Sequence, residues 1–476
     1  MMPLTRKVLP VATALFAITL AGCATVDIRG SVDRANTDAA AFTQGGLSLA
    51  QTDAQRAVSM SAAEAMLGKP LSQDDAVALA LVNSPAMQAL LAQHWADSAD
   101  AAQGGRINNP ILTLERLRSP IEIEISRMLA FGLLDLITLP SRQRVAQSRI
   151  EQAQWQLTGN VVEQVTQVRL AWVNAVASAQ ALQYAKQVND SAEASAELAR
   201  RMLAVGNFSK LQRARQQAFY ADAVVLWANA AQTAKANREA LVQLLGLTDV
   251  QATRLQLPAR LPELPEVPRE PAEVARAASN ARIDVKMAQA SLDVIAKAQG
   301  INLIGSFTDI ELSIIRNTKT ERVDGQKTQL RGAEIALKLP LFDWGDLRRD
   351  AERAQALAAA NRLEATVRAA GSILRETYAA YRTNYDVAKH YRDEIVPLKK
   401  LIADENVLRY NGMLIGVFEL LADSRDQIAS VSAAINAQRQ FWLVDAALQA
   451  TIMGKPTMTP MMSAAPAKSG GSDAPH

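Results

Sequence analysis

The sequence contains the same series of features twice, and this duplication limits the folds that are open to the chain. A helical stretch breaks at Gly206 and resumes a few residues later, and the same break recurs at Gly412. Each half also has a Leu-Pro pair, at 139–140 and 339–340, followed by a basic helical start. Because the order of parts is identical, the sequence indicates two structural repeats, at residues 71–246 and 272–454.

Each predicted repeat contains helices much longer than an ordinary domain needs. Apolar residues recur at alternating intervals of four and three, which is the pattern of a coiled-coil seam. At about 1.5 Å per residue, a helix of about 60 residues reaches about 90 Å. We expect long coiled coils at 142–246 and 346–454, which Gly159 and Pro397 bend. The seam positions are Val161, Val165, Val168, Trp172, Ala175, Ala179 and Leu182 in the first repeat, and Ala370, Leu374, Thr377, Tyr381, Asn384, Ala388, Tyr391, Ile395 and Leu398 in the second.

Short alternating segments predict one strand hairpin in each repeat. Residues 121–126 place isoleucines on one face and carboxylates on the other, and residues 332–339 alternate in the same way. Their expected partners are residues 111–117 and 301–315. The hairpins therefore fall at about 109–139 and 301–340, although a half-buried sheet in water would show the same period.

Two hairpins give four strands per chain, whereas single-chain membrane barrels have about eight or more. An open sheet edge is not tolerated in lipid, so other copies of the chain must complete the sheet. A dimer would supply about 8 strands and a trimer about 12, and only the larger number leaves a wide lumen. The predicted fold is mostly α with a small β part. Long antiparallel coiled-coil helices form a trimeric α-barrel, and four strands per chain contribute to a 12-stranded membrane β-barrel.

The N-terminus has the layout of a secretory signal. Arg6 and Lys7 precede an apolar run of about 13 residues, which is shorter than the ~20 residues of a membrane-spanning helix. Leu20, Ala21 and Gly22 then precede Cys23, the only cysteine in the sequence, in a pattern similar to the bacterial lipobox. We expect a lipoprotein signal peptide at 1–22 and a covalent lipid on Cys23. Residues 23–70 are then a lipidated strap, extended or partly helical.

The remaining segments are a linker and a tail. Five prolines between Pro258 and Pro271 predict an extended, non-helical linker at 247–271. Residues 455–476 are rich in Pro, Ser, Gly and Ala, and the composition predicts a disordered tail.

Charge and composition exclude several functions. Without Arg6 and Lys7, the 51 basic residues fall to 49 against 48 acidic ones, which argues against nucleic acid as a partner. The three histidines, His94, His390 and His476, have no ligand spacing, so neither a metal site nor a catalytic site is expected. No apolar stretch after residue 23 is long enough for a membrane-spanning helix.

Taken in order, these features resemble one family closely, the TolC-like outer-membrane efflux channels, and in particular their lipidated branch. The resemblance extends from Leu71 to Gly454. The segments that carry it are LSQDDAVALALVNSP at 71–85, LVQLLGL at 241–247, KLPLFDWGDLRR at 338–349 and the two glycine hairpins.

The resemblance implies a homotrimer in the outer membrane whose helical tunnel extends into the periplasm. Its implied partners are a periplasmic adaptor (membrane fusion) protein, an inner-membrane efflux transporter and outer-membrane lipid. The protein would be a passive conduit and not an enzyme, with no cofactor other than the lipid on Cys23. The competing interpretation is a non-conducting periplasmic coiled-coil scaffold lipoprotein.

The resemblance also implies that the hairpins at Gly206 and Gly412 form the periplasmic tips. In the family, acidic side chains shortly after the second glycine constrict the tunnel, and Glu419 and Asp423 fall there. The loop has one extra residue, however, and Ala422 stands where a second carboxylate is expected. Two solvated charges on a helix are the other interpretation. On the first hairpin, Lys210 and Arg213 are candidates to pair with these carboxylates and hold the tips closed.

Overall fold

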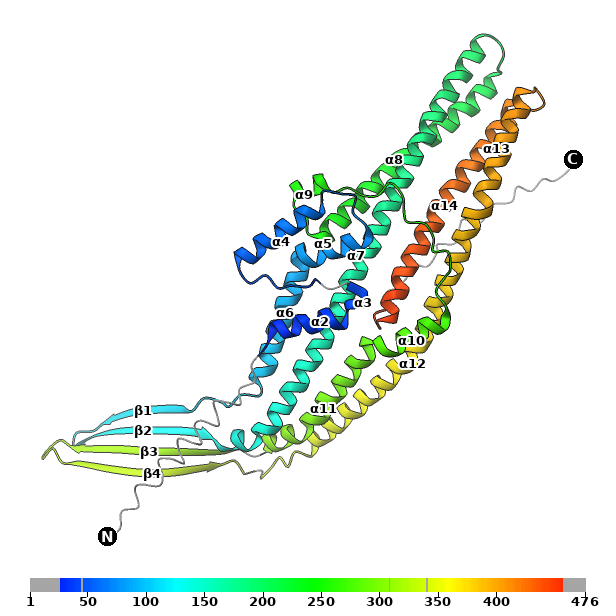
Figure 1. Cartoon of the computed structure of the whole chain (residues 1–476). Coiled ribbons are helices and arrows are strands. Elements are labelled where there is room, and N and C mark those ends of the chain that lie inside the picture. Colours follow the sequence, from blue (N-terminus) through cyan, green and yellow to red (C-terminus); the bar gives the residue numbers. More distant parts are fainter. Residues whose placement is uncertain (1–25, 44–45, 308, 340, 457–476) are drawn as a thin grey trace. The chain divides into compact units, whose positions relative to one another are not determined.

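The computed structural model describes residues 26–43, 46–307, 309–339 and 341–456 (Figure 1). The chain forms two compact units. Unit 1 consists of the chain up to Gln51, Pro85–Val161 and Ile283–Ala370, and unit 2 of Thr52–Ser84, Val162–Arg282 and the chain from Gly371 onward. Each unit therefore draws segments from both predicted repeats.

Unit 1 contains the sheet and the helices that flank it in the sequence. Its short helices are α2 (Ile28–Asp38) and α3 (Ala40–Thr43), followed by α6 (Pro85–Gln103) and α11 (Ile283–Phe307). The N-terminal parts of two longer helices, α7 (Leu133–Ala204) and α12 (Asp346–His390), also belong to it.

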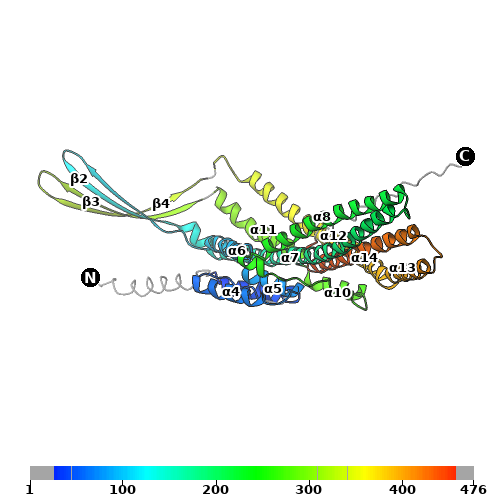
Figure 2. The same ribbon diagram turned by 90° about the horizontal axis from the view of Figure 1, so that it is seen from above.

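The sheet has four antiparallel strands in the order β1-β2-β3-β4 (Figures 1 and 2). Strands β1 (Ile111–Arg118) and β2 (Glu122–Gly132) form the first hairpin, and β3 (Ile310–Glu321) and β4 (Lys327–Leu337) form the second. The two hairpins are joined by β2 and β3, which pair from Glu122–Glu321 to Gly132–Glu311. The prediction of four strands is confirmed, and each edge strand, β1 or β4, pairs on one side only.

The strand boundaries differ from the predicted ones. The strand expected from residue 301 begins at Ile310, because α11 continues to Phe307. A short apolar run has no periodicity that separates a strand from a helix, and here the helix that starts at Ile283 prevails. Likewise β2 extends beyond the predicted 121–126 as far as Gly132, and β4 covers 327–337 instead of 332–339.

Helix α7 also begins earlier than predicted. It starts at Leu133 instead of residue 142, within the segment assigned to the first hairpin, and contains Pro140. Pro140 is the eighth residue of the helix and lies beyond the first four amides, which have no intrahelical acceptor, so α7 lacks one intrahelical hydrogen bond at this position. The helix is 72 residues long and is not interrupted at Gly159.

The segment before residue 51 is fixed to unit 1 by polar contacts. The Gln154 side chain of α7 donates to the Ser31 carbonyl over 2.9 Å. Gln88 of α6 accepts from the Ala50 amide at 2.9 Å and donates to the Ser48 carbonyl at 2.8 Å. The segment is partly helical, through α2 and α3.

Unit 2 contains two helical hairpins. The C-terminal part of α7 turns into α8 (Lys210–Leu245), and α13 (Val396–Asn411) turns into α14 (Val417–Ile452). In both views α8 lies alongside α7, and α14 lies alongside α13 (Figures 1 and 2). The shorter helices of the unit are α4 (Asp53–Met66), α5 (Gln73–Asn83), α9 (Asp249–Arg254) and α10 (Pro271–Ala281).

The predicted seam of α7 is largely buried. Val165, Val168, Trp172 and Ala175 are each at most 3 % exposed. The indole of Trp172 donates to the Leu71 carbonyl over 2.9 Å, so its polar edge is also satisfied.

The linker was predicted to be non-helical over 247–271, but residues 249–254 form helix α9, and only Leu255 to Glu270 contain no helix or strand. This non-helical part packs against aromatic side chains of α12 and α14. The Tyr385 hydroxyl lies 3.0 Å from the carbonyls of both Pro265 and Glu266, and Trp442 donates to the Pro262 carbonyl at 3.0 Å. Prolines leave carbonyls without backbone partners nearby, and these side chains supply the missing donors. The linker thereby completes a core that comprises Leu264, Val274, Tyr381, Tyr385, Ala388, Phe441, Val444 and Leu448.

The irregularity expected at Pro397 takes the form of a π-helical turn, η1 (Tyr391–Ile395), between α12 and α13. Proline cannot donate a hydrogen bond to the preceding turn, and just before it the Val396 amide donates to the Tyr391 carbonyl five residues back, which is the π-helical pattern. No single described helix is long and apolar enough to span a membrane, and α5 and α6 meet that measure only when counted together.

Candidate functional site

The first helical hairpin ends α7 in a Schellman motif. The Asn207 amide donates to the Met202 carbonyl at 2.8 Å and the Gly206 amide to the Leu203 carbonyl at 3.0 Å. This motif requires a left-handed residue, and Gly206 supplies it with φ +79°. Ser209 then caps α8 through a capping box with Gln212. The predicted turn at Gly206 thus has a local cause.

The second hairpin uses the same motif in a shifted position. The Leu414 amide donates to the Arg409 carbonyl at 2.9 Å and the Met413 amide to the Tyr410 carbonyl at 3.0 Å. The left-handed position therefore falls on Met413, with φ +58°, while Gly412 keeps φ −80°. Among described non-glycine residues, Met413 alone has a positive φ. Because the loop has one extra residue, Gly412 lies one position before the residue that must be left-handed.

We expect Met413→Gly to stabilise the second hairpin by about 1 kcal/mol, because a side chain in the left-handed region costs about 1–2 kcal/mol and glycine recovers most of it. Gly412→Ala should be nearly neutral, since an added Cβ at that position would meet no atom closer than 3.6 Å. Thermal unfolding midpoints of the two variants test this, and a lower midpoint for Met413→Gly contradicts it.

The four candidate gate residues all lie in unit 2. Lys210 is the first residue of α8, and both it and Arg213 are exposed. Asp423 of α14 accepts a hydrogen bond from the Asn406 side chain of α13. The backbone of Glu419 lies in α14, but its side chain lies outside the described part of the chain. Between the described side chains, neither Lys210 nor Arg213 forms an ion pair with Asp423, so the predicted gate pairing stays a prediction.

Two contacts of α14 were not indicated by the sequence patterns. Lys399 of α13 lies 3.0 Å from Asp426 of α14, which ties the two helices together. The Arg425 guanidinium of α14 lies 4.4 Å above the Phe219 ring of α8, and this cation–π contact joins the two hairpins within one chain. The heptad pattern gave no signal for either contact, because each depends on which helix faces which.

A buried polar network supports unit 2. The Arg169 guanidinium, 5 % exposed, donates to Gln449 Oε1 at 2.6 Å, and Gln449 donates to Asp445 Oδ2 at 2.6 Å. Arg269 of the linker donates to Asp445 Oδ1 at 3.3 Å. Burial lowers the pKa of Arg169, and the negative charges of Asp74 and Asp445 oppose that shift. The network joins α7, α14 and the linker.

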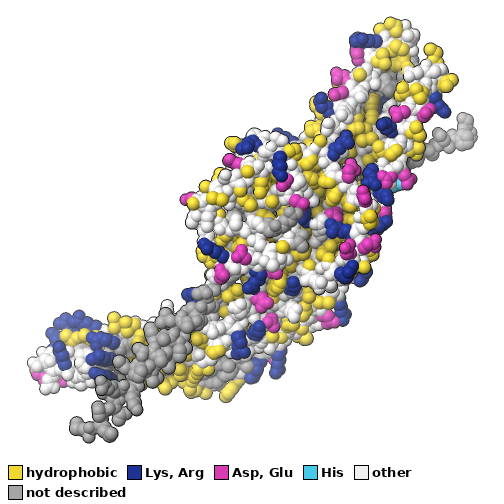
Figure 3. Space-filling view, viewed as in Figure 1, with side chains coloured by type: hydrophobic (Ala, Val, Ile, Leu, Met, Phe, Trp, Pro, Cys, Tyr) yellow, Lys and Arg dark blue, Asp and Glu magenta, His cyan; other side chains and the backbone are white. Residues whose placement is uncertain are grey.

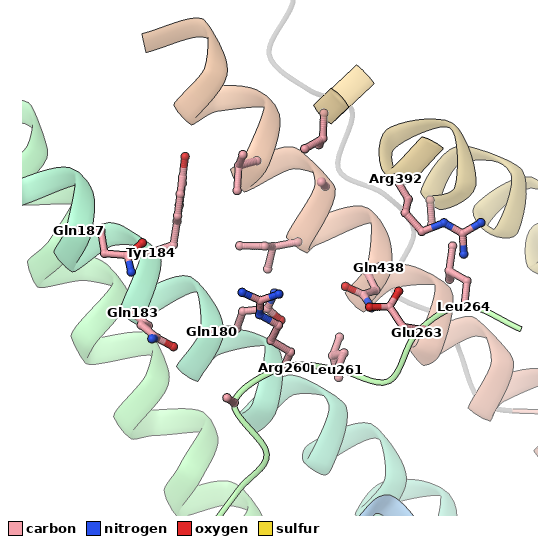
Figure 4. Close-up of a pocket in the computed structure, with 16 residues that line it drawn as sticks. Gln180, Gln183, Tyr184, Gln187, Arg260, Leu261, Glu263, Leu264, Arg392 and Gln438 are labelled. Carbon is pink, nitrogen blue, oxygen red and sulfur yellow. The ribbon is translucent and has the colours of Figure 1, made fainter. Parts of the chain in front are cut away.

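Unit 2 also holds a half-open cavity of about 470 Å³ beside the linker (Figure 4). Amide side chains of α7 line one side, and Arg260 and Glu263 of the linker line the other. Gln438 extends from α14 and donates to the Pro262 carbonyl at 2.8 Å. The lining residues labelled in the figure are Gln180, Gln183, Tyr184, Gln187, Arg260, Leu261, Glu263, Leu264, Arg392 and Gln438.

The strand register gives the sheet of unit 1 two faces of different chemistry. Directly paired residues share a face, so the pairs Leu312–Ile335 and Ile310–Leu337 lie on one side. This apolar face comprises Leu112, Leu114, Arg116, Arg118, Ile123, Ile125, Arg127, Leu129, Phe131, Ile310, Leu312, Ile314, Arg316, Thr318, Thr320, Lys327, Gln329, Arg331, Ala333, Ile335 and Leu337. The other, polar face carries every glutamate of the strands: Glu115, Glu122, Glu124, Glu311, Glu321 and Glu334.

Part of the chain matches a known protein family. Residues 274–400 match the family model "Outer membrane efflux protein". No curated protein sequence shows significant similarity to the chain.

Solved structures of bacterial membrane proteins have the same fold. A membrane protein from Pseudomonas aeruginosa is 18 % identical, with a TM-score of 0.67 over 81 % of this chain and 95 % of that one. The CmeC outer membrane channel of Campylobacter jejuni is 13 % identical, with a TM-score of 0.64 over 83 % and 86 %. The outer membrane protein VceC of Vibrio cholerae is 15 % identical, with a TM-score of 0.64 over 81 % and 96 %. The matched family model lies within the second repeat, and the fold is the one that these solved structures share.

Proposed function

We propose that three copies of the chain form the outer-membrane channel of a tripartite efflux system. The observation that carries the proposal is the sheet itself, with one apolar face and two open edges. On the apolar face Ile335 is 67 % exposed and Leu114 is also 67 % exposed, which is costly in water. Lipid would cover that face, and β4 of one copy would pair with β1 of the next.

In this assembly the polar face of the sheet would line the passage. Its carboxylates outnumber its basic groups, and Lys319 lies 3.3 Å from Glu124 and 3.8 Å from Glu122. A lumen with excess carboxylates favours cations. A non-conducting periplasmic scaffold would not explain why the sheet has an exposed apolar face. No observation favours the scaffold interpretation.

The finer parts of the proposal extend to partners and anchoring. A periplasmic adaptor would dock at the hairpin turns around Gly206 and Met413, and an inner-membrane transporter would supply the cargo and the energy. Cys23 lies outside the described residues. The sequence pattern around it supports a lipid anchor, which mass spectrometry of the mature N-terminus would test.

The decisive experiment is reconstitution of the purified full-length protein. A channel should resist extraction from outer membranes by alkaline carbonate, migrate as a trimer and conduct in a planar bilayer. A soluble monomer without conductance would overturn the proposed function. The same protein with Cys23→Ser separates insertion by strands from anchoring by lipid, because a scaffold would leave the membrane and a channel would not.

Charge reversal at the hairpin turns tests the gate. If Arg213 pairs with Glu419 or Asp423, Arg213→Glu and Glu419→Lys should each raise single-channel conductance. The gain should be modest, because one surface pair contributes only about 0–1 kcal/mol. The double variant should return toward the wild-type value. Lys235→Glu, in the middle of α8, serves as the control for charge alone, and unchanged conductance in both single variants rejects the gate.

A further inference from the structure

The apolar face of the sheet carries a row of arginines that its own chain does not neutralise. Arg127, Arg316 and Arg331 occupy directly paired positions on β2, β3 and β4, because Arg127 pairs with Arg316 and Arg316 with Arg331. We call these three residues the arginine row. All three side chains are exposed, and dark blue side chains gather over the sheet in Figure 3.

The contacts of the arginine row are neutral. Arg127 lies 3.5 Å from the Thr318 hydroxyl, and Arg316 donates to Gln329 Oε1 at 3.2 Å. Within the described ranges, no carboxylate lies within ion-pair distance of any of the three guanidinium groups. Like charges directly opposite each other on neighbouring strands destabilise a sheet, so this arrangement needs an external anion.

A second copy of the chain does not supply that anion. All glutamates of the strands lie on the polar face, and copies joined edge to edge continue the same face from one chain to the next. The apolar face of a neighbouring copy would add only more basic residues, since Arg116, Arg118 and Lys327 lie there too.

The row also divides the apolar face into two bands. Toward the helix-connected ends of the strands lie Leu129, Phe131, Ile314 and Ile335, with further apolar residues beside them. Toward the opposite ends, Thr318, Thr320 and Gln329 replace them, although Ile123 and Ile125 continue the apolar pattern on β2. In a membrane, the boundary between an apolar and a polar band on a lipid-facing surface lies at the headgroups.

We propose that the arginine row binds the phosphate groups of anionic membrane lipids. Neighbouring strands are about 4.8 Å apart, so three guanidinium groups lie close enough to share a phosphate or two adjacent ones. Guanidinium groups bind phosphate oxygens with two parallel hydrogen bonds, and loss of lipid hydration strengthens them. This inference rests on the proposed function, because it needs the apolar face to contact lipid.

Native mass spectrometry of the full-length protein, released from mixed phosphatidylglycerol and phosphatidylcholine nanodiscs, tests the proposal. The wild type should retain phosphatidylglycerol in preference to phosphatidylcholine. Substitution of all three arginines (R127Q, R316Q and R331Q) should weaken phosphatidylglycerol binding about 100-fold, and the triple lysine variant should keep most of it.

Two controls make the outcomes separable. The triple variant R348Q, R349Q and R353Q removes three exposed charges of α12 in the same unit and should retain the lipid. Inorganic phosphate, added at constant ionic strength, should not displace the lipid. The proposal is wrong if the variant with R127Q, R316Q and R331Q retains as much phosphatidylglycerol as the wild type, or if free phosphate displaces the lipid. Either outcome would leave the proposed channel function unaffected. Failure of the wild type to enter the bilayer at all rejects the proposed function.

Discussion

Ile335→Arg should prevent stable insertion of the protein into membranes. Ile335 lies on the apolar face of β4, opposite Leu312, and on the helix-connected side of the arginine row. An arginine at the lipid-facing midplane of a barrel costs about 2–4 kcal/mol, and closed assembly repeats this cost in every copy. We expect most of the variant to be extracted by alkaline carbonate and to yield no conductance.

The neighbouring residue provides a matched control. Ala336 lies on the polar face of the same strand, opposite Glu311. Ala336→Arg adds the same charge and volume, but the new side chain points toward carboxylates, so insertion should be close to wild type. If the two arginine variants insert equally well, the assignment of the two faces is wrong.

Asp445→Leu should cost unit 2 about 3–5 kcal/mol of unfolding free energy. Asp445, whose side chain is 8 % exposed, accepts hydrogen bonds from Arg269 and Gln449. Its loss leaves the buried guanidinium of Arg169 without one of its two compensating carboxylates. Removing one partner of a buried charged network is costly because the other charge stays buried.

Urea denaturation followed by far-ultraviolet circular dichroism would measure this effect. Asp386→Leu is the matched control, since Asp386 pairs with Arg382 at 3.0 Å on the surface of α12 and both side chains are about half exposed. Its cost should stay below about 1 kcal/mol. Similar losses in the two variants would show that the network around Asp445 does not stabilise the fold.

The four strands and the buried seam of α7 could be predicted from sequence patterns. The strands were predicted from alternation within each segment, and the register, which the sequence did not give, then places Ile123, Leu312 and Ile335 on one face. The burial of Trp172 follows from the heptad pattern. These patterns are local in the sequence, so they can be recognised without knowing the tertiary contacts.

The errors have equally physical causes. Residues 301–307 form a short, largely apolar run that was assigned to a strand, but α11 extends through them, because a helix already formed upstream propagates at little cost. The exchange of roles between Gly412 and Met413 depends on where α13 ends, and helix ends are not fixed by composition.

The candidate site was harder to predict than the fold. The arginine row is invisible in the linear sequence, because its members are separated by long segments and meet only through the pairing of β2, β3 and β4. The same holds for the contact of Arg425 with Phe219. Contacts between distant strands depend on the pairing register, and a slip of one residue would move every side chain of a strand to the other face.

The two edges of the sheet, β1 and β4, are different surfaces, so in the proposed trimer the copies would join head to tail. Such a barrel closes only when the β1 edge of every subunit pairs with a β4 edge, so a single subunit with a blocked β1 edge would leave the whole barrel open. In a cell that expresses equal amounts of intact and edge-blocked chains, random mixing would leave only about one ring in eight complete. A defective gene copy would therefore act dominantly over a normal one.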